Sequence, residues 1–571
     1  MKTERWKPPL MLTLLPVGVG TGAALIAQAF VAAVVWLNDV LLITPGSRGR
    51  AEADLLLVAT LAVPTLGGLL VGLLRRRAGA ERMQGPADVI AAVQTRAGGM
   101  AGRAGLATAG GSLLSIGSGA TVGEYGPLVH MGGTLGSALA RLFRTDVTVI
   151  NIAVACGVAA AIATVFNAPL AGILFAHEVV LRHFAPRAFA PVALAAIIGY
   201  IVANALGARV PMLAREQLGS PALWEFGLFA LLGVAGAALA TAFMHAILGA
   251  SRAARRFRRC EPLKPALAGL VLGSVALVLP EVLGMGFELL RSVTMGDIGL
   301  PVAMLALILA ARLATTAMCL GLGFVGGVFS PAMVLGALFG AIYGIGLAQG
   351  AGLPVIDASA YAICGMVAVT APVIGAPVTA VVIVMELTGS YALTLAALAA
   401  VGIANFIVAR TFGRCLFDRE LRDRALDLSG GRSKAILGSR DIAPLVSDRY
   451  VAAGADDRVD SVRRAALDAR RGKVFLVDGD GVYQGSVRLE DLAVADAGQR
   501  AIELRDRDDI VMLEHLSLWR AMQRMRRFDG ESVAVIDDEG RLVGTLFTSE
   551  LVSQFLDIQS DLRGEEQIRT D

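Results

Sequence analysis

Charged side chains are scarce in this sequence. Only 17% of the 571 residues are charged, aromatic residues make up 6%, and histidine occurs five times. Hydrophobic residues reach 55% and the mean hydropathy is +0.66, values that exclude an ordinary soluble globule and predict a polytopic membrane protein. The five cysteines have no paired spacing, which excludes a disulfide framework and a cysteine-based metal site. They are Cys156, Cys260, Cys319, Cys364 and Cys415.

Residue patterns that would indicate an intramembrane enzyme are also missing. The apolar stretches contain no facing pair of aspartates, no serine–histidine dyad and no H-E-x-x-H run. We therefore expect neither catalysis nor a bound metal or other cofactor in the apolar part of the chain.

The charges that are present divide the chain in two. Residues 1–430 carry 30 basic and 21 acidic residues, a net charge of +9, whereas residues 431–571 carry 21 basic and 27 acidic residues, a net charge of −6. We predict a membrane domain over 1–428 and a soluble domain over 429–571. The basic clusters at 75–82 and 251–259, together with the basic N-terminus, are expected in the cytoplasm by the positive-inside rule. Their apolar flanks argue against nucleic-acid binding.

The apolar part contains an internal duplication. "FNAPLAGILFAHEVV" (166–180) matches "IGAPVTAVVIVMELT" (374–388), with Glu178 and Glu386 separated by 208 positions. "GEYGPLVHMGG" (123–133) matches "GGVFSPAMVLG" (326–336), with Pro127 and Pro331 separated by 204. Two patterns in the same order at nearly one offset predict repeats over about 55–210 and 260–425. Short apolar segments broken by Gly and Pro in both halves are typical of a transporter binding site.

The soluble tail carries a second repeat. "VFLVDGDGVYQGSVRLEDL" (474–492) matches "VAVIDDEGRLVGTLFTSEL" (533–551), and each reads as two strands around an Asp/Gly turn followed by a helix start. An amphipathic helix precedes each copy, over 459–470 and 518–528. The tail is therefore predicted to hold two small α+β modules, at about 440–497 and 503–557.

The two glycine-rich turns of the membrane repeat predict an anion site. A helix N-terminus presents unpaired N–H groups and a partial positive charge, and glycine allows an ion to approach the backbone closely. Proline suits the first helical turn. Irregular backbone at membrane depth is tolerated where it is buried or lines a cavity. Two such turns meeting near the bilayer midplane would bind an anion without lysine or arginine, although small-residue helix packing remains the alternative.

These motifs resemble those of the CLC family of chloride channels and chloride/proton exchangers. "GEYGP" is similar to the family's G-R-E-G-P, "GGVFSP" to its G-x-F-x-P, and the tail to the paired CBS modules of many members. The resemblance implies an all-α polytopic membrane protein with a CLC-type inverted repeat, followed by a cytoplasmic α+β CBS-pair domain. It also implies a homodimer in a cytoplasmic (inner) membrane. The implied anion-binding and gating residues are Gly123, Glu124, Tyr125, Gly126, Pro127, Gly327, Val328, Phe329, Phe417, Met83, Gln84 and Gly85.

Several positions depart from the family pattern. Tyr125 stands where the gating glutamate is expected, and Val179 stands where the exchangers carry a proton-relay glutamate. Phe417 takes the place of a central tyrosine, and Met83 falls near a serine of the family's G-S-G-I-P loop. A phenol with a reference pKa of about 10 stays neutral where a carboxylate near 4.3 would exchange protons.

We therefore expect a passive chloride channel or an uncoupled anion transporter. Its Tyr125 hydroxyl would donate to the anion or close the outer entrance, unless the ring only fills space. The alternatives are a proton-coupled exchanger that uses His177 and Glu178, and a non-conducting membrane-anchored sensor built on the CBS pair. A fluoride exporter, suggested by Met83, is disfavoured because that group keeps the gating glutamate.

For several other polar side chains we expect an ordinary structural role. Glu124 is expected to be a solvated or salt-bridged glutamate at the rim, His177 and His130 to be packing histidines, and Glu386 to be a capping or cytoplasm-facing acid. In the tail, the family's nucleotide pattern G-h-h-T-x-x-D is degenerate, with acids only at Asp491 and Glu550. The sequence leaves two alternatives open for the tail, a purely structural role or the binding of adenine nucleotide.

Overall fold

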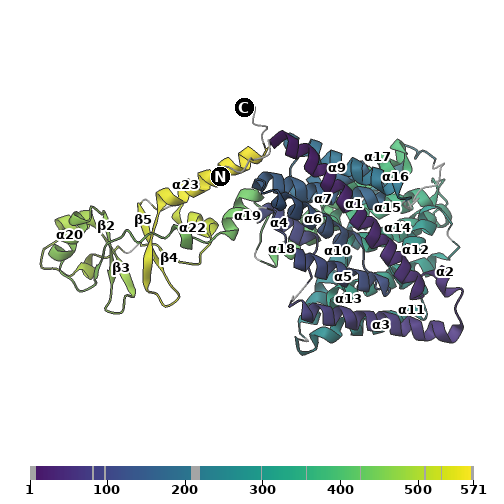
Figure 1. Ribbon diagram of the computed structural model, residues 1–571, viewed down its shortest axis with the longest axis horizontal. Coiled ribbons are helices and arrows are strands. Elements are labelled where there is room, and N and C mark those ends of the chain that lie inside the picture. Colours follow the sequence, from purple (N-terminus) through teal and green to yellow (C-terminus); the bar gives the residue numbers. More distant parts are fainter. Residues whose placement is uncertain are drawn as a thin grey trace. The chain divides into compact units, whose positions relative to one another are not determined.

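A computed structural model of the chain describes residues 8–79, 83–95, 98–207, 219–256, 258–297, 299–354, 356–424, 426–506, 509–526, 528 and 530–566. The basic N-terminal residues Lys2, Arg5 and Lys7 therefore lie outside the described residues. Two compact units are present, Met1–Arg424 and Ala425–Asp571. Figure 1 shows that the first is built from helices and that the second contains the strands.

Within the described residues, the first unit has eighteen α-helices, with short 3-10 and π-helical segments between some of them. They are α1 (Pro8–Val40), α2 (Pro45–Arg48), α3 (Ala53–Arg77), α4 (Pro86–Thr95), α5 (Gly102–Gly117), α6 (Tyr125–Leu142), α7 (Val147–Phe166), α8 (Pro169–Phe175), η1 (Ala176–Leu181), α9 (Pro186–Ala205), α10 (Glu225–Arg255), η2 (Arg258–Leu263), α11 (Lys264–Ala276), η3 (Pro280–Val282), α12 (Phe287–Thr294), α13 (Val302–Leu322), α14 (Phe329–Ile345), η4 (Gly346–Gly350), α15 (Ala358–Ile374), α16 (Pro377–Thr388), α17 (Tyr391–Thr411) and α18 (Leu416–Arg422).

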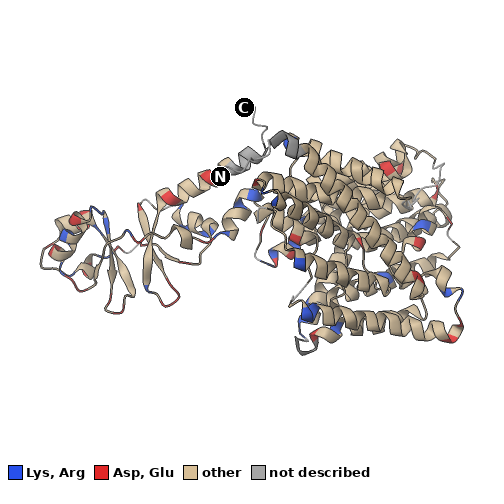
Figure 2. Cartoon of the chain, viewed as in Figure 1, with Lys and Arg blue, Asp and Glu red and all other residues tan. Residues whose placement is uncertain are grey.

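Many of these helices suit a membrane. Within the described residues, eight helical stretches are long and apolar enough to cross one, and α8 with η1, α15 and α16 are shorter apolar segments. Lys, Arg, Asp and Glu lie mostly toward the ends of the helices (Figure 2). These short helices agree with the prediction of short apolar segments in both halves.

The helices pair in two corresponding sets. α6 packs on α7 as α14 packs on α15, and α7 packs on α9 as α15 packs on α17. α1 contacts α7 and α9, and α10 makes the corresponding contacts with α15 and α17. The first set thus includes α1, which precedes the predicted repeat start near residue 55. α7 and α15 are almost fully buried and form the centre of each set, while α3 and α11 lie side by side (Figure 1).

The same residue pattern precedes the short helix α8 in the first set and α16 in the second. A left-handed residue ends the preceding helix, Asn167 after α7 and Gly375 after α15. An alanine follows, and then a proline occupies the first helical position of α8 and of α16. Proline lacks the N–H group that would be unpaired there, which makes it a favourable start.

The second unit contains two α+β modules, as the tail repeat predicted. In each, a short strand pairs in parallel with a central strand, which pairs antiparallel with the third, giving the orders β1-β2-β3 and β4-β5-β6. The first and shortest strand of each sheet was not predicted. The elements are α19 (Gly431–Ser439), η5 (Ala443–Leu445), β1 (Ala452–Gly454), α20 (Val459–Asp468), β2 (Lys473–Val477), β3 (Tyr483–Arg488), α21 (Leu489–Val494), η6 (Ala501–Leu504), β4 (Val511–Leu513), α22 (Leu518–Met525), β5 (Ser532–Ile536), β6 (Leu542–Phe547) and α23 (Thr548–Glu566).

Each module has its own apolar core. Val459, Val474, Leu476 and Val487 are fully buried in the first core, and a matching cluster around Val533 fills the second. The alternation of buried and exposed positions along β3 and β6 is weak because the inner residues form short continuous runs.

Candidate functional site

The two glycine turns of the repeat lie against each other. The Gly123 N–H donates to the Gly327 carbonyl oxygen at 2.8 Å, and the Gly327 N–H donates to the Gly123 oxygen at 2.6 Å. A Cβ atom on Gly126 would stand 2.8 Å from the Gly327 Cα. Only glycine allows so close an approach of two backbones. The predicted meeting of the turns is confirmed.

Helix N-termini converge at this junction. α6 begins at Tyr125 and α14 at Phe329, and neither start has a side-chain cap. The start of α4 is also close, since a Cβ on Gly126 would lie 3.5 Å from Cδ of Pro86. Unpaired N–H groups at helix starts carry partial positive charge and bind anions. The stretches 121–133 and 323–335 contain no lysine or arginine, so backbone supplies this potential.

Tyr125 lies in a cluster of aromatic rings. Its ring stacks on Phe166 with centroids 4.2 Å apart and planes 13° from parallel. It also tilts against Phe329 at 5.0 Å and meets Phe287 edge to face at 6.3 Å. Tyr125 is 2% exposed, and its hydroxyl makes no hydrogen bond with any of the described residues. The ring therefore fills buried space, and the hydroxyl remains available to a ligand.

Two further polar side chains at the turns are buried. Glu124 is 2% exposed, its Oε2 atom has no hydrogen-bond partner, and it forms no ion pair within the described chain. The expectation of a solvated or salt-bridged rim glutamate is therefore wrong, because the turn folds inward between packed helices. Ser330 is fully buried, and its Oγ, also without a partner, would lie 2.8 Å from a Cβ on Gly123. Sequence reasoning missed Ser330, although the quoted GGVFSP motif contains it.

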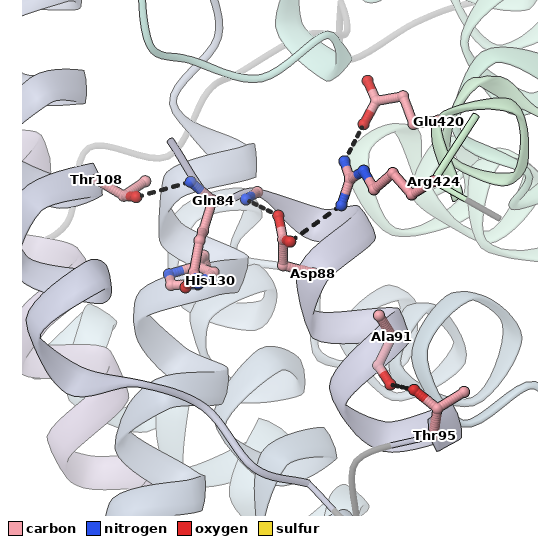
Figure 3. A network of polar contacts seen from close by, with 9 residues as sticks. Gln84, Asp88, Ala91, Thr95, Thr108, His130, Glu420 and Arg424 are labelled. Atoms are coloured by element: carbon pink, nitrogen blue, oxygen red, sulfur yellow. Dashed lines mark hydrogen bonds and ion pairs between the residues drawn. The ribbon is translucent and has the colours of Figure 1, made fainter. Parts of the chain in front are cut away.

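The segment Met83-Gln84-Gly85 leads into α4 beside the junction. The Gln84 N–H donates to Thr108 Oγ1 at 3.1 Å, and Gln84 Oε1 lies 2.9 Å from His130 Nε2 (Figure 3). The Met83 methyl group would lie 3.7 Å from a Cβ on Gly111. His130 is thus anchored to this loop, as a packing histidine would be, and its Nδ1 has no partner.

The start of α4 is held by a short polar network. The Gly85 N–H donates to Asp88 Oδ2 at 2.8 Å, so Asp88 caps its own helix. Asp88 Oδ1 also pairs with Arg424 at 3.0 Å, and Arg424 reaches Glu420 at 3.3 Å (Figure 3). This network ties the loop before α4 to the end of the first unit.

Val179 and Phe417 lie on two elements that are joined by an ion pair. Val179 is 3% exposed in η1, a π-helical segment. Phe417 is 6% exposed on α18, which packs on α4, and it makes no ring contact with the Tyr125 cluster among the described residues. Arg182, at the end of η1, pairs with Asp418, the residue after Phe417. Both positions are therefore apolar and buried.

The two repeat glutamates cap each other's helices. Glu178, in the first turn of η1, accepts from the Val378 N–H at 3.0 Å and from the Thr379 N–H and hydroxyl at 2.9 and 2.8 Å, at the start of α16. Glu386, at the end of α16, accepts from the Leu170 and Ala171 N–H groups at 2.8 and 2.7 Å, at the start of α8. The capping role expected for Glu386 is confirmed.

His177 also has a packing role, as expected. Its Nδ1 lies 3.0 Å from the His183 carbonyl oxygen, and its ring stacks near Phe184 and Phe189. It stands next to Glu178, whose carboxylate is already occupied by backbone donors.

Comparison with known proteins identifies the family. The family model described as "Voltage gated chloride channel" matches residues 67–409, more than half of the chain. The chain belongs to this chloride channel (CLC) family. It is 32% identical over 372 residues to a "Putative chloride channel protein ClcB-like" of Ralstonia nicotianae, covering 62% of this chain and 83% of the relative. It is also 32% identical to the "H(+)/Cl(-) exchange transporter ClcA" of Vibrio parahaemolyticus, covering 55% of this chain and 70% of the relative.

Solved CLC structures share the fold. A slow cyanobacterial Cl-/H+ antiporter aligns with a TM-score of 0.63 at 22% identity, over 72% of this chain and 97% of that one. A eukaryotic CLC transporter aligns with a TM-score of 0.61 at 20% identity, over 95% of this chain and 98% of that one. The predicted CLC-type membrane fold is therefore confirmed, and the chain is a membrane-spanning member of a family of anion channels and transporters.

The candidate nucleotide positions of the second unit differ between the two modules. In the first, Arg505 packs against Gly485, and Arg488 pairs with Asp506 at 3.0 Å. In the second, an open pocket of about 570 Å³ is lined by residues 444–449 and by polar residues of α23 that include Glu550. Among the described residues, no cluster of His, Cys, Asp and Glu could hold a metal ion.

Proposed function

We propose that this protein conducts chloride passively, as a channel or an uncoupled transporter, without exchanging protons. The observation that carries the proposal is the chemistry at the two positions where the exchangers carry glutamates. Tyr125 is a neutral phenol held in an aromatic stack, and Val179 is a buried aliphatic residue. Neither titrates near neutral pH, so a proton has no carrier at either position.

The anion site itself does not depend on those side chains. The converging starts of α4, α6 and α14 supply N–H groups and partial positive charge whatever residue stands at position 125. The backbone amides of Val328, Phe329 and Tyr125 are the proposed ligands. Chloride is the proposed anion because the names of the relatives specify chloride.

A proton-coupled exchanger is the second candidate, because several relatives are named H+/Cl- exchange transporters. Such a path would need His177 and Glu178 to carry protons. The contacts of both residues argue against it. Glu178 accepts three hydrogen bonds at the start of α16, and His177 is packed between aromatic rings. Protonating Glu178 would remove a helix cap each time a proton passed.

We further propose a homodimer in the inner membrane, with residues 425–571 in the cytoplasm. The orientation follows from the basic residues at the end of α3 and α10, which the positive-inside rule places in the cytoplasm. We give the paired modules a stabilising role, and adenine nucleotide, if bound, would take the open pocket that Glu550 lines.

Purified protein in chloride-loaded liposomes tests the main proposal. Valinomycin is added to clamp the potential, chloride efflux is followed with an electrode, and external pH is recorded in the same vessel. We expect chloride to leave with no proton movement in a fixed ratio. Proton uptake stoichiometric with chloride would refute the proposal and would make His177 and Glu178 the residues to mutate. Absence of any flux would favour a non-conducting sensor.

A further inference from the structure

One basic side chain differs from all others in the structure. Among the described residues, Arg312 is the only lysine or arginine that is buried, with 2% of its surface exposed. It lies in α13, one of the helices long enough to cross the membrane. No carboxylate within the described chain lies at ion-pair distance from it, and its Nε atom has no hydrogen-bond partner. A buried charge in a membrane helix is costly and by default suggests a function.

The guanidinium group is fitted to the loop between α11 and α12. Its Nη2 donates to the Gly284 carbonyl oxygen at 2.8 Å. Gly286, which precedes α12, has a left-handed φ of +81°, and a Cβ there would lie 2.1 Å from Nη1 of Arg312. The glycine therefore lets the planar group lie directly against the backbone at a helix start.

This loop adjoins the glycine turn of Tyr125. The Gly284 N–H donates to the Gly119 carbonyl oxygen at 2.8 Å, and the Thr121 hydroxyl donates to the Val282 oxygen at 2.9 Å. Phe287, the residue after Gly286, meets the Tyr125 ring edge to face. Arg312 is thus linked to the turn at residues 119–125 through one loop.

The loop lies on the side of the membrane opposite to the basic clusters. The side chain of Ile43, which follows α1, lies next to both Gly119 and Gly284. Ile43 lies before α3 (Ala53–Arg77), which is long enough to cross the membrane and carries the basic cluster with Arg75 at its far end. With the basic clusters inside, the loop that Arg312 contacts lies on the outer side of the Tyr125 turn.

We propose that Arg312 is the cation that attracts the anion to the outer side of Tyr125. This inference rests on the proposed anion conduction. The turns contain no lysine or arginine, and the buried Glu124 would repel an anion when ionised. A positive charge in a poorly screened interior acts over about 10 Å, so Arg312 raises the local anion concentration while its hydrogen bond positions the loop. The Glu281 carboxylate, whose charge opposes that of Arg312, weakens this attraction.

Matched variants separate charge from position. Arg312→Gln removes the charge and can still donate to Gly284, whereas Arg312→Lys keeps the charge and loses the planar group. Glu281→Gln removes the opposing charge without touching Arg312. Initial chloride uptake into liposomes is measured against external chloride concentration, with external pH recorded at the same time. Thermal unfolding of each variant controls for stability.

We expect Arg312→Gln to raise the half-saturating external chloride concentration about tenfold, and Arg312→Lys to stay within about threefold of the wild type. Glu281→Gln should lower that concentration. Equal impairment by both arginine variants, with a lower unfolding temperature, would show a purely structural role, and an unchanged half-saturation in Arg312→Gln would equally overturn the inference. If Arg312→Gln does not fold, the direction of the Glu281→Gln shift decides. Coupled proton movement would refute the proposed function alone, since half-saturation is read independently.

Discussion

The reciprocal caps at Glu178 and Glu386 allow a prediction with a magnitude. Glu178 accepts three hydrogen bonds at the start of α16, and Glu386 accepts two at the start of α8. A hydrogen bond to a charged group contributes about 1.5–3 kcal/mol, and a negative charge at a helix start adds about 0.3–1 kcal/mol. A glutamine keeps one accepting oxygen but turns a donor toward the helix start.

We therefore expect Glu178→Gln to destabilise the protein by about 2–4 kcal/mol and Glu386→Gln by somewhat less, because it loses fewer bonds. The membrane setting lowers these values if the unfolded chain finds other partners. The assay is thermal unfolding of the purified protein in detergent, followed by the loss of its monodisperse fraction. Chloride flux and external pH are then measured on each variant at a temperature where it is folded.

The matched pair makes the result decisive. If both glutamates are caps, the two variants lose stability together and leave the ratio of protons to chloride unchanged. A Glu178→Gln variant with wild-type stability and altered proton movement would refute the capping argument. Glu386→Gln is the control, because it perturbs the equivalent helix start without touching His177 or its neighbours.

Three other predictions concern single contacts. Tyr125→Phe keeps the aromatic stack, so unchanged flux and anion selectivity would show that the hydroxyl does not contact the anion, whereas reduced selectivity for chloride would show that it does. Asp88→Asn keeps one oxygen that can accept from the Gly85 N–H but loses the charge that pairs with Arg424, and should lower the unfolding temperature and slow chloride flux by loosening the start of α4; flux equal to wild type would contradict this. Asp509→Asn removes the carboxylate that lies 2.7 Å from the half-buried Lys473 ammonium, which should cost the first tail module about 3 kcal/mol; hydrogen exchange of β2 and β3 in the full chain measures it, with chloride flux as the control.

Much of the architecture was predictable because short sequence motifs mark the corresponding elements of the repeat. The prolines that begin α8 and α16, and the glycines of the two turns, set helix starts wherever they occur. Two matching patterns were therefore enough to predict that the turns meet. The correspondence of α1 and α10 was not predictable in the same way. Both are long apolar helices, and their sequences share no motif that would match one to the other. Only their contacts in the structure show the correspondence.

The sequence did not predict which individual charged side chains are buried. Glu124 follows a glycine in a polar-looking turn, and nothing local indicates that neighbouring helices cover it. Arg312 had a usable signal, a lone arginine in the apolar run 302–322, but its loop partners Gly284 and Gly286 are distant in sequence. The strands β1 and β4 were missed because three residues are too few for a recognisable alternation.

The construction of the proposed anion site is compatible with a tyrosine in place of a carboxylate. The site is formed by glycine backbones and helix starts, and none of these contacts requires an acidic side chain. An anion therefore loses no backbone ligand when Tyr125 replaces the glutamate of the family pattern. What disappears is a group that can take up a proton and compete with chloride. On the proposed function, coupling and conduction thus depend on different parts of the same turn, and the first can be lost while the second remains.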